Sequence, residues 1–474
     1  MTPDEFRRFG HELIDWIAAH RAGASARPVM NSNTPGSVKS RLPQTPPQDA
    51  EPWSAVLRDF EEFIAPAVVD WQHPRFFGYF PSNSLLAGVL ADLLSTGLGV
   101  NGLTWQSSPA VTELEEVVAD WVRQMVGLPE TFSGVIQDTA SSCTLVALIC
   151  ARERATDYAI ARGGLRGEQQ RLRVYASAHS HSSVEKAALL ADYGRDNLRL
   201  VPCDSEYALR PEALEAMIGE DQRAGHRPAA IVATVGTTTT TAMDPLAAIA
   251  AIARRHGLWL HVDCAMAGSA MILPECRRLW AGVEAADSLV LNAHKWLGVP
   301  FDCSLYYVRD PEHLVRVMST NPSYLQSAAD GQVKQYRDWG IPLGRRFRAL
   351  KLWFVVREQG VSGLAARLRR DLRNAQSLAA AVRMTPDWRL LAPVPLQTLC
   401  VRHEPAGLEG DALDRHTLAW VSHINRSGAA YLTPAQLDGR WMARISIGAA
   451  TTEAADIEIA WRAIRQAAET AAAA

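Results

Sequence analysis

Cysteine is scarce in this chain of 474 residues. Its seven cysteines are scattered, with no C-x-x-C pair and no cluster of histidines at the spacing of metal ligands. This pattern argues against a disulfide framework and against a metal site. An excess of one charge is missing too, because 48 basic and 51 acidic residues leave a formal net charge of −3. Nucleic acid and anionic membranes are therefore not expected partners, and small neutral or zwitterionic substrates fit better.

Long hydrophobic runs are also missing. No stretch of about 18 apolar residues free of charge occurs, so no transmembrane helix is expected. The segment Thr2-Pro-Asp-Glu5 is a capping box that predicts the start of a helix rather than the apolar core of a signal peptide. We therefore expect a cytoplasmic protein, and its length allows two or three domains with a large core.

Two short polar segments are the most informative residues that the chain does contain, His261-Val-Asp263 and Asn292-Ala-His-Lys295-Trp296. The amine of Lys295 can form a Schiff base with the aldehyde of pyridoxal 5'-phosphate. The carboxylate of Asp263 can keep the pyridine nitrogen protonated, so that the ring accepts electrons from a carbanion. The two residues together predict an electron-sink enzyme that uses this cofactor.

The spacing of these segments supports the same hypothesis. A short β-branched run precedes each of them, and a helical pattern ended by Gly257 leads into the first. The expected strands are 229–235, 258–262 and 288–291. In such a βαβ unit, ligands gather beyond the carboxyl ends of the strands, where Asp263 and Lys295 both fall. Taken alone, Asp263 could cap a loop and Lys295 could be a surface lysine, but their joint placement favours the cofactor.

Two other segments add weaker indications. Small hydroxylated residues at Gln137-Asp-Thr-Ala-Ser141-Ser-Cys-Thr144 open an apolar helical run, and the N–H groups of Ala140 and Ser141 could hold a phosphate there. An ordinary Ser/Thr cap is the alternative. His181 follows another predicted strand, where its ring could stack on the cofactor and touch a substrate carboxylate. A lone histidine is more often an ordinary loop residue.

The rest of the pattern predicts three parts. Residues 1–82 form a helical arm, 83–352 a large doubly wound α/β domain, and 353–474 a small α+β domain with an antiparallel sheet. In the last part we expect helix 364–384, strand 396–402, helix 412–427, strands 428–433 and 441–447, and a final helix. The apolar face of the first helix and the proline-rich stretch 27–52 suggest an arm that packs on a second subunit, although packing on its own body is the alternative.

Further motifs are spread over nearly the whole chain. They are His73-Pro-Arg-Phe-Phe-Gly-Tyr-Phe-Pro81, Trp105-Gln-Ser-Ser-Pro109 with Thr112-Glu-Leu-Glu115, His181-Ser-Ser-Val-Glu185, Gly236-Thr-Thr-Thr239, Asp302-Cys-Ser304 and Ile341-Pro-Leu-Gly-Arg-Arg-Phe347. With the Asp263 and Lys295 segments, they resemble group II pyridoxal-phosphate-dependent decarboxylases of the aromatic-L-amino-acid type. The resemblance implies an aspartate aminotransferase-like fold (PLP fold type I), whose large domain has a mainly parallel sheet, and a homodimer with shared active sites.

The resemblance also implies a role for each motif residue. Lys295 would hold the cofactor, Asp263 would pair with its pyridine nitrogen, and His181 would stack on the ring. The phosphate would be surrounded by Ala140, Ser141, Asn292 and His294, and the other side of the ring would be lined by Thr237 and Ala265. Tyr324 lies in the polar segment 309–338, which is consistent with a lid, and would deliver the proton to the carbon that lost carbon dioxide. A surface aromatic is the alternative for Tyr324.

The expected substrate is an aromatic L-amino acid: DOPA, tryptophan, 5-hydroxytryptophan, tyrosine or phenylalanine. The residues expected to bind it are Trp71, Tyr79, Phe80, Pro81, Ser82, Asn101, Leu103 and Gly344. The first four form a rigid aromatic cluster suited to a flat side chain, although a plain aromatic core would read the same way. Ser82 could hydrogen-bond a ring hydroxyl, and Gly344 leaves room for an indole. Met266, Asp138 and Asn101 depart from the family pattern, and Asn101 could recognise an indole N–H or a phenol from the partner subunit.

Three other functions remain open. An oxidative aldehyde synthase of the same family would convert the amino acid to an aldehyde with oxygen, but such relatives lose the lid tyrosine or the stacking histidine, which are present here as Tyr324 and His181. An aminotransferase would use the same aspartate and lysine. A protein that keeps the fold without catalysis is the third alternative.

Overall fold

The computed structural model describes residues 1–31, 33–320, 322–326 and 329–472, and the side chain of Tyr324 lies outside the described part. The chain divides into two compact units, which are described separately. One unit comprises 82–370 and 392–396, and the other comprises 1–81, 371–391 and 397–474. The first is called the sheet unit below, and the second is called the terminal unit.

A seven-stranded sheet forms the centre of the sheet unit, in the order β1-β7-β6-β5-β4-β2-β3. Its strands are β1 (Ser133–Gln137), β2 (Leu172–Ser177), β3 (Leu198–Val201), β4 (Arg227–Thr234), β5 (Trp259–Asp263), β6 (Ser288–Asn292) and β7 (Ser304–Val308). Strand β7 runs antiparallel to β1 and β6, and the other neighbouring pairs are parallel. The predicted α/β fold with a mainly parallel sheet is confirmed.

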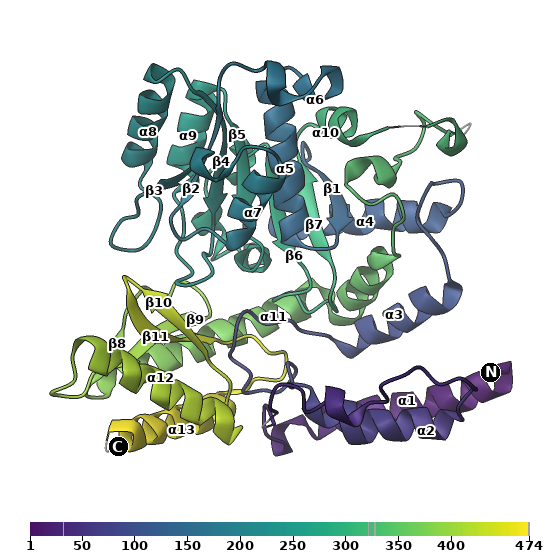
Figure 1. Cartoon of the computed structure of the whole chain (residues 1–474), viewed down its shortest axis with the longest axis vertical. Helices are drawn as coiled ribbons and strands as arrows, with labels where there is room; N and C mark the ends of the chain where they lie inside the picture. Colours follow the sequence, from purple (N-terminus) through teal and green to yellow (C-terminus); the bar gives the residue numbers. More distant parts are fainter. Residues whose placement is uncertain (32, 321, 327–328, 473–474) are drawn as a thin grey trace. The chain divides into compact units, whose positions relative to one another are not determined.

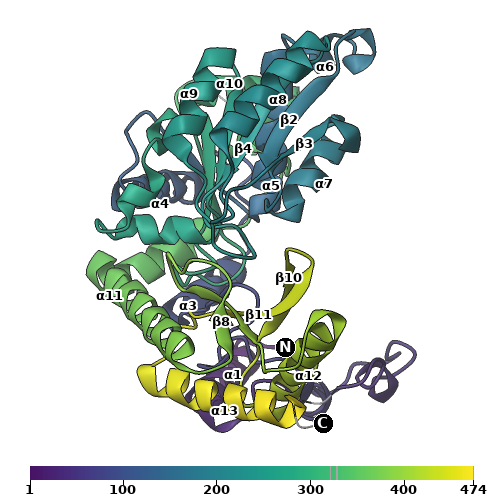
Figure 2. The same ribbon diagram turned by 90° about the vertical axis from the view of Figure 1, so that its left-hand side faces the viewer.

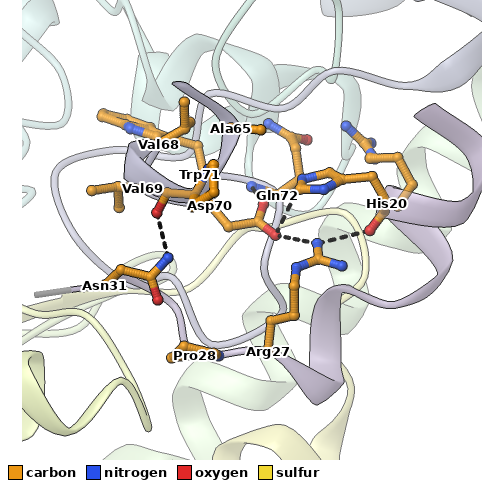
Figure 3. Close-up of a pocket in the computed structure, with 12 residues that line it drawn as sticks. His20, Arg27, Pro28, Asn31, Ala65, Val68, Val69, Asp70, Trp71 and Gln72 are labelled. Carbon is orange, nitrogen blue, oxygen red and sulfur yellow. Dashed lines mark hydrogen bonds and ion pairs between the residues drawn. The ribbon is translucent and has the colours of Figure 1, made fainter. Parts of the chain in front are cut away.

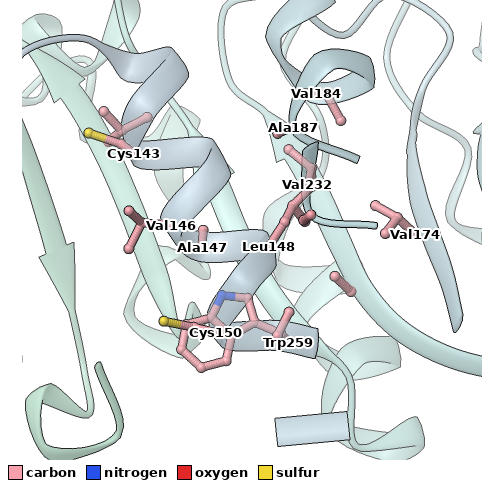
Figure 4. Packing of buried hydrophobic residues seen from close by; sticks show 14 of the residues in the cluster. Cys143, Val146, Ala147, Leu148, Cys150, Val174, Val184, Ala187, Val232 and Trp259 are labelled. Carbon is pink, nitrogen blue, oxygen red and sulfur yellow. The ribbon is translucent and has the colours of Figure 1, made fainter. Parts of the chain in front are cut away.

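Helices cover both faces of this sheet, as expected for strands that are buried on both sides. The helices of the unit are α3 (Leu86–Leu98), α4 (Pro109–Val126), α5 (Ala140–Ala155), α6 (Ala159–Arg162), α7 (Ser182–Leu190), α8 (Pro211–Arg223), α9 (Leu246–His256) and α10 (Pro311–Met318). Helices α5 and α7 lie on one side, and α4 and α9 lie on the other (Figures 1 and 2). The apolar side chains of α5, such as Val146 and Cys150, pack against Val174, Val232 and Trp259 of the sheet (Figure 4).

The predicted βαβ unit is present. Strands β4, β5 and β6 lie side by side and parallel, within two residues of the predicted bounds. Helix α9 connects β4 to β5 and ends at Gly257, whose φ of +67° is the left-handed cap that glycine adopts most easily. The runs were predicted well because their side chains are buried on both faces, which leaves a continuous apolar pattern.

The terminal unit begins with the predicted capping box. Glu5 N–H donates to Thr2 Oγ1 at 3.2 Å and Thr2 N–H donates to Glu5 Oε2 at 2.7 Å, at the start of α1 (Pro3–Ala22). Helix α2 (Trp53–Asp59) follows the proline-rich stretch, and the ring of Trp53 stacks on Phe9 of α1 at 5.2 Å. No residue of α1 is buried within the chain.

A four-stranded antiparallel sheet in the order β10-β11-β9-β8 completes the terminal unit. Its elements are β8 (Trp388–Leu390), β9 (Thr398–His403), α12 (Gly410–Ser427), β10 (Thr433–Leu437), β11 (Arg440–Ser446) and α13 (Ala454–Ala472). The predicted antiparallel sheet backed by helices is confirmed. Helix α11 (Arg348–Met384) begins in the sheet unit, bends at Gly360, and contains the predicted helix 364–384.

One predicted strand is wrong. Residues 428–432 are not a strand, and β10 begins only at Thr433. Gly428 caps α12 with a φ of +72°, and the side chain of Asn425 holds both the N–H and the C=O of Leu432 at 2.8 and 2.9 Å. These side-chain bonds occupy the backbone groups that a strand would pair. The three-residue β8 was not predicted.

Candidate active site

Asp263 is the last residue of β5, and only 4% of its surface is exposed. Its Oδ1 accepts a hydrogen bond of 3.0 Å from the backbone N–H of Ala265, which fixes the carboxylate at the carboxyl end of the strand. The neighbouring strand contributes the N–H of Val235, which donates to the Asp263 carbonyl at 2.9 Å. A buried carboxylate is costly unless a cation or a donor compensates it, so this position suits a cationic ligand group.

Lys295 stands in the turn that follows the adjacent strand β6. Its backbone N–H donates to the carbonyl of Asn292 at 3.1 Å, and the side-chain amide of Asn83 donates to the Lys295 carbonyl at 3.4 Å. The residue is half-buried, whereas its neighbours on both sides are buried. The turn that carries Lys295 is therefore held by hydrogen bonds at its backbone.

His181 is the N-cap of α7, and its ring orientation is set by a local hydrogen bond. The N–H of Ser183 donates to Nδ1 at 3.1 Å, so the neutral imidazole carries its proton on Nε2. Desolvation lowers the pKa of His181, the carboxylate of Asp263 raises it, and the ammonium of Lys295 lowers it. Two of the other predicted catalytic residues, Asp263 and Lys295, therefore lie within electrostatic reach of His181.

His294 provides a second neutral imidazole beside Lys295. Its Nδ1 accepts a hydrogen bond of 2.9 Å from the N–H of Cys303, which places the ring proton on Nε2. Burial, together with the positive charge of Lys295, lowers the pKa of His294 to about 4. The ring is thus an uncharged N–H donor at neutral pH.

The first turn of α5 supplies more donors near the same strands. The helix starts at Ala140, after Thr139 as its N-cap, so the N–H groups of Ala140 and Ser141 have no partner within the helix. Negative charge from Asp138 and Asp263 raises the pKa of Cys143 further above the value set by burial, which places this turn close to Asp263. Asp138, one of the departures from the family pattern, turns back to accept from the N–H of Thr139 at 2.6 Å.

Other predicted cofactor residues lie at the same edge of the sheet. Asn292 ends β6, and its Oδ1 accepts from Ser304 Oγ at 2.7 Å. Ala265 accepts from the N–H of Asn292 at 2.8 Å, and buried Thr237 follows β4 and accepts from the N–H of Ala242 at 3.0 Å. Met266, one of the departures from the family pattern, is buried.

The predicted substrate residues fall in both units. In the sheet unit, Asn101 and Gly344 are neighbours, because Asn101 Oδ1 accepts from the N–H of Arg345 at 2.9 Å. A Cβ atom at position 344 would lie 3.2 Å from Asn101 Nδ2, so glycine leaves space for that amide. Leu103 and Ser82 are half-buried.

In the terminal unit, the predicted aromatic cluster is present. The ring of Trp71 stacks on Tyr79 at 5.4 Å and 9°, and Phe80 precedes Pro81 at the end of the segment. Tyr431, which was not predicted, stacks on Tyr79 with its ring centre at 6.1 Å. The aromatic residues thus form one surface within this unit.

Arg444 of β11 was also not predicted. Its buried guanidinium lies 4.2 Å from the ring centre of Phe80, and its Nη1 donates to the carbonyl of Tyr79. Its Nε and Nη2 have no hydrogen-bond partner among the described residues. An arginine at an inward position of an apolar strand is a pattern that could have identified it.

A separate cavity of about 480 Å³ lies within the terminal unit (Figure 3). Arg27 crosses it, donating to Asp70 Oδ2 at 3.0 Å and to the carbonyl of His20 at 2.7 Å. Trp71 is part of its lining, but none of the predicted cofactor residues is. Within the described residues, no group of three or more potential ligands is placed to hold a metal ion.

The residues at the carboxyl ends of the strands fit pyridoxal phosphate. A buried carboxylate suits a protonated pyridine nitrogen, and a half-buried lysine beside it suits an aldehyde. The unpaired N–H groups of the first turn of α5 and the neutral Nε2–H of His294 suit a phosphate dianion. Gly236 contributes close packing here, because a Cβ atom on it would lie 2.4 Å from Ala267 Cβ.

Comparisons with known proteins point the same way. The conserved domain of pyridoxal-dependent decarboxylases matches residues 35–404. The chain is 40% identical to phenylacetaldehyde synthase of Arabidopsis thaliana, covering 98% of this chain and 96% of that one. It is 39% identical to aromatic-L-amino-acid decarboxylase of Bos taurus, over 99% and 97% of the two chains. The crystal structure of Oryza sativa TDC with PLP and tryptamine superimposes with a TM-score of 0.96 at 33% identity, over 99% of both chains.

Proposed function

The chain belongs to the pyridoxal-dependent decarboxylase family, and we propose that it removes the α-carboxylate of aromatic L-amino acids as carbon dioxide. The product is the corresponding arylalkylamine, which makes the protein a carboxy-lyase. The proposal rests on the arrangement of Asp263, Lys295 and His181 within electrostatic reach at the carboxyl ends of the strands. Relatives named as aromatic-amino-acid, tryptophan and tyrosine decarboxylases support the substrate class.

Bound pyridoxal phosphate supplies an electron sink for the electron pair left when the bond from Cα to the carboxylate breaks. Lys295 would hold the cofactor through its aldehyde. Asp263, held by the N–H of Ala265, keeps a proton on the pyridine nitrogen. The phosphate is held by Ala140, Ser141, Asn292 and His294, and the ring is lined by Thr237 and Ala265.

His181 has a second task in the proposed reaction. Its ring stacks on the cofactor, and its Nε2–H is a donor for the substrate carboxylate, because Nδ1 is occupied by the N–H of Ser183. Asp263 and Lys295 act on the pKa of this ring in opposite directions. Tyr324, whose side chain lies outside the described part of the structure, delivers a proton to Cα after carbon dioxide has left.

The substrate ring is proposed to pack on the aromatic surface around Trp71 and Tyr79. Its flat stacking geometry suits an aromatic side chain, and Phe80 and Pro81 extend it. Ser82, Asn101, Leu103 and Gly344 would select among phenyl, phenol, catechol and indole rings. A crystal structure of Catharanthus roseus tryptophan decarboxylase in complex with L-tryptophan, 33% identical with a TM-score of 0.92, supports an aromatic substrate.

The test is a screen of amine and carbon dioxide release across the five aromatic amino acids. We expect equal amounts of both products with at least one substrate, and neither with Lys295→Ala, which also loses the visible absorbance of bound cofactor. Amino-group exchange with an added keto acid, without carbon dioxide release, would instead indicate an aminotransferase. Absence of both activities in a cofactor-loaded protein would contradict the proposal.

An oxidative aldehyde synthase is the second candidate, favoured by the 40% identity to phenylacetaldehyde synthase. That reaction consumes one oxygen and one water, and it releases aldehyde, carbon dioxide, ammonia and hydrogen peroxide. Oxygen consumption equal to carbon dioxide release would assign this activity. We expect the wild type to consume little oxygen and Tyr324→Phe to consume more, because the variant lacks the proposed proton donor to Cα.

We also propose a homodimer with shared active sites. Helix α1 has no buried residue in the single chain, and α3 exposes a row of leucines at positions 86, 90, 93, 94 and 98. Apolar side chains exposed on these two helices favour a second copy of the chain as the partner. The loop that follows α3 carries Asn101 and Leu103, and it would reach the partner's substrate site.

Two assignments complete the proposal. The three segments 1–82, 83–352 and 353–474 serve as dimerisation arm, cofactor domain and small domain. The cytoplasm is the proposed compartment, and the free thiols of all seven cysteines fit a reducing environment. Among the helices of the described ranges, none is long and apolar enough to cross a membrane.

A further inference from the structure

Three basic residues, Arg345, Arg348 and Lys351, stand at every third position around the start of α11. Each forms an ion pair with a carboxylate in a different segment of the chain. Arg345 pairs with Glu115 of α4 at 2.7 Å, Arg348 with Asp302 before β7 at 2.9 Å, and Lys351 with Asp92 of α3 at 3.1 Å. Arg345 belongs to the motif 341–347 and Arg348 directly follows it, and the proposed function gives a role to Gly344 of this motif but to neither arginine. We call this row the cation ladder.

The first rung reaches the strand that leads to α5. Arg345 Nη2 donates to Glu115 Oε1 and to the carbonyl of Ile136, both at 2.7 Å, and Glu115 Oε1 accepts from the N–H of Ile136 at 2.8 Å. Arg345 and Glu115 are both buried. One buried ion pair therefore holds both backbone polar groups of Ile136, four residues before the first residue of α5.

The second rung reaches the turn beside His294. Arg348 grips Asp302 with two hydrogen bonds of 2.9 and 3.1 Å, a bidentate geometry that fixes the carboxylate in its plane. The next residue, Cys303, donates its N–H to His294 Nδ1 at 2.9 Å and accepts from the N–H of His294 at 3.1 Å. The position of Asp302 therefore sets the tautomer and the direction of the His294 ring.

Ser304 joins the two rungs. Its hydroxyl lies 2.7 Å from Asn292 Oδ1 and 3.1 Å from the carbonyl of Asp138. Asp138 directly follows β1, the strand that Arg345 binds at Ile136. Ser304 follows Cys303 in the turn whose Asp302 is bound by Arg348. Ser304 thus connects the strand that leads to the N-terminus of α5 with the turn that orients the His294 ring. Arg345 and Arg348 act on these two groups through intermediate residues.

We propose that Arg345 and Arg348 are positioning residues for the cofactor phosphate, acting through Glu115 and Asp302 on the first turn of α5 and on His294. The inference rests on the proposed function, because it takes these groups as the phosphate site. Anion binding is strongest when the hydrogen-bond donors are already held in place before the ligand binds. A phosphate donor that becomes mobile therefore binds the phosphate more weakly, even though the donor itself is still present. A purely structural ion pair would contribute to folding but would not distinguish one ligand from another.

The experiment compares two ligands of the apoprotein, pyridoxal phosphate and pyridoxal, which differ only in the phosphate. Arg348→Lys and Arg345→Lys keep the charge but replace the planar guanidinium, and Arg348→Lys also loses the bidentate pair with Asp302. Each is expected to raise the Kd of pyridoxal phosphate about tenfold, the worth of one hydrogen bond to a charged group, and to leave the Kd of pyridoxal within about twofold. Both constants follow from titration of the bound-cofactor absorbance, without turnover.

Arg369 offers a matched control in the same unit. It makes a bidentate pair with Glu275 at 2.6 and 3.0 Å, on exposed side chains. Arg369→Lys should change neither Kd. If an arginine variant fails to fold, Asp302→Asn, which keeps the side-chain shape, is expected to show the same selective loss for pyridoxal phosphate.

The possible failures are distinct. Equal weakening of both ligands in the ladder variants, or no weakening of either, would overturn the positioning role while leaving the decarboxylase assignment intact. A wild-type apoprotein that binds pyridoxal as tightly as pyridoxal phosphate would overturn the proposed phosphate site, and the positioning role with it.

Discussion

His261 Nδ1 lies 2.9 Å from Ser288 Oγ, and the two residues stand on the neighbouring strands β5 and β6. The same hydroxyl accepts a hydrogen bond of 3.0 Å from Trp259 Nε1. His261 Nε2 has no hydrogen-bond partner among the described residues. This histidine is fully buried two positions before Asp263, and burial lowers its pKa to about 4.

The folded protein should therefore lose stability in mild acid. The unfolded state takes up a proton on His261 near pH 6.5 and the folded state only near pH 4, so the contribution is present above pH 6.5 and is lost as the pH falls toward 4. Between pH 7 and 5 the loss amounts to about 2 kcal/mol. His261→Asn removes the titrating group and keeps an acceptor for Ser288. The difference between the free energies of unfolding at pH 7 and pH 5, measured with denaturant, should therefore be about 2 kcal/mol smaller than in the wild type.

His11→Asn, at an exposed position, is the control and should leave this difference unchanged. A His261→Asn protein with the wild-type pH dependence would refute the explanation.

Asn101 should influence the choice of aromatic substrate. The structure shows that Asn101→Leu alone is a poor test, because Leu would leave the N–H of Arg345 without its acceptor at an expected cost of about 1–3 kcal/mol. Asn101→Asp keeps that acceptor, removes the amide donor and adds a negative charge. We expect kcat/KM for tryptophan and DOPA to change by about threefold or more relative to phenylalanine in both variants. Identical ratios in the wild type, Asn101→Asp and Asn101→Leu would show that the amide does not select the ring.

The exposed leucines of α3 should hold the proposed dimer together. Leu90 and Leu94 are 47% and 50% exposed and lie one turn apart on the same face. The double change Leu90→Glu and Leu94→Glu places charge in an apolar contact, and sedimentation equilibrium should show monomers at concentrations where the wild type is dimeric. Leu190→Glu is the control, because Leu190 is a leucine of 63% exposure at the end of another helix, α7. A dimer that survives the double change would place the interface elsewhere.

Strands and site residues could be predicted from the sequence where their positions depend on local patterns of side chains. Strands β4, β5 and β6 were predicted within two residues because their side chains are buried, apart from the first two residues of β4, and this leaves an apolar run that periodicity detects. Asp263 and Lys295 were placed at one edge because chain direction alone brings the carboxyl ends of parallel strands together. The strand expected at 428–433 failed because one side chain, Asn425, binds the backbone of Leu432, and no periodicity records such a bond.

The missed site residues share a different cause. Arg444 meets the carbonyl of Tyr79 across 365 positions of the chain, and Tyr431 stacks on the same tyrosine from a loop that looks like an ordinary surface segment. Likewise, Arg348 acts on His294 only through Asp302 and Cys303. Contacts between segments that are distant in the sequence form only in the folded protein. Residue type and spacing could therefore identify these residues as unusual, but they could not predict their contact partners.

Arg444 should matter more for turnover than for stability. Its guanidinium is buried over Phe80 with two nitrogen atoms lacking partners, and burial lowers its pKa to about 10. Removing an incompletely paired buried charge costs the fold little, so Arg444→Met should unfold within about 1 kcal/mol of the wild type. The same change frees the backbone of Tyr79, and misplacing the aromatic surface should lower kcat/KM about tenfold or more.

Arg440→Met provides the comparison on the same strand, since Arg440 forms ion pairs with Asp411 and Asp414 of α12. Its kinetics should match the wild type. Because the position of the aromatic surface limits the reaction under this hypothesis, the loss in Arg444→Met should be similar for tryptophan and DOPA. A large loss of stability with unchanged kcat/KM would instead make Arg444 a structural residue, and a loss restricted to one substrate would make it a specificity residue.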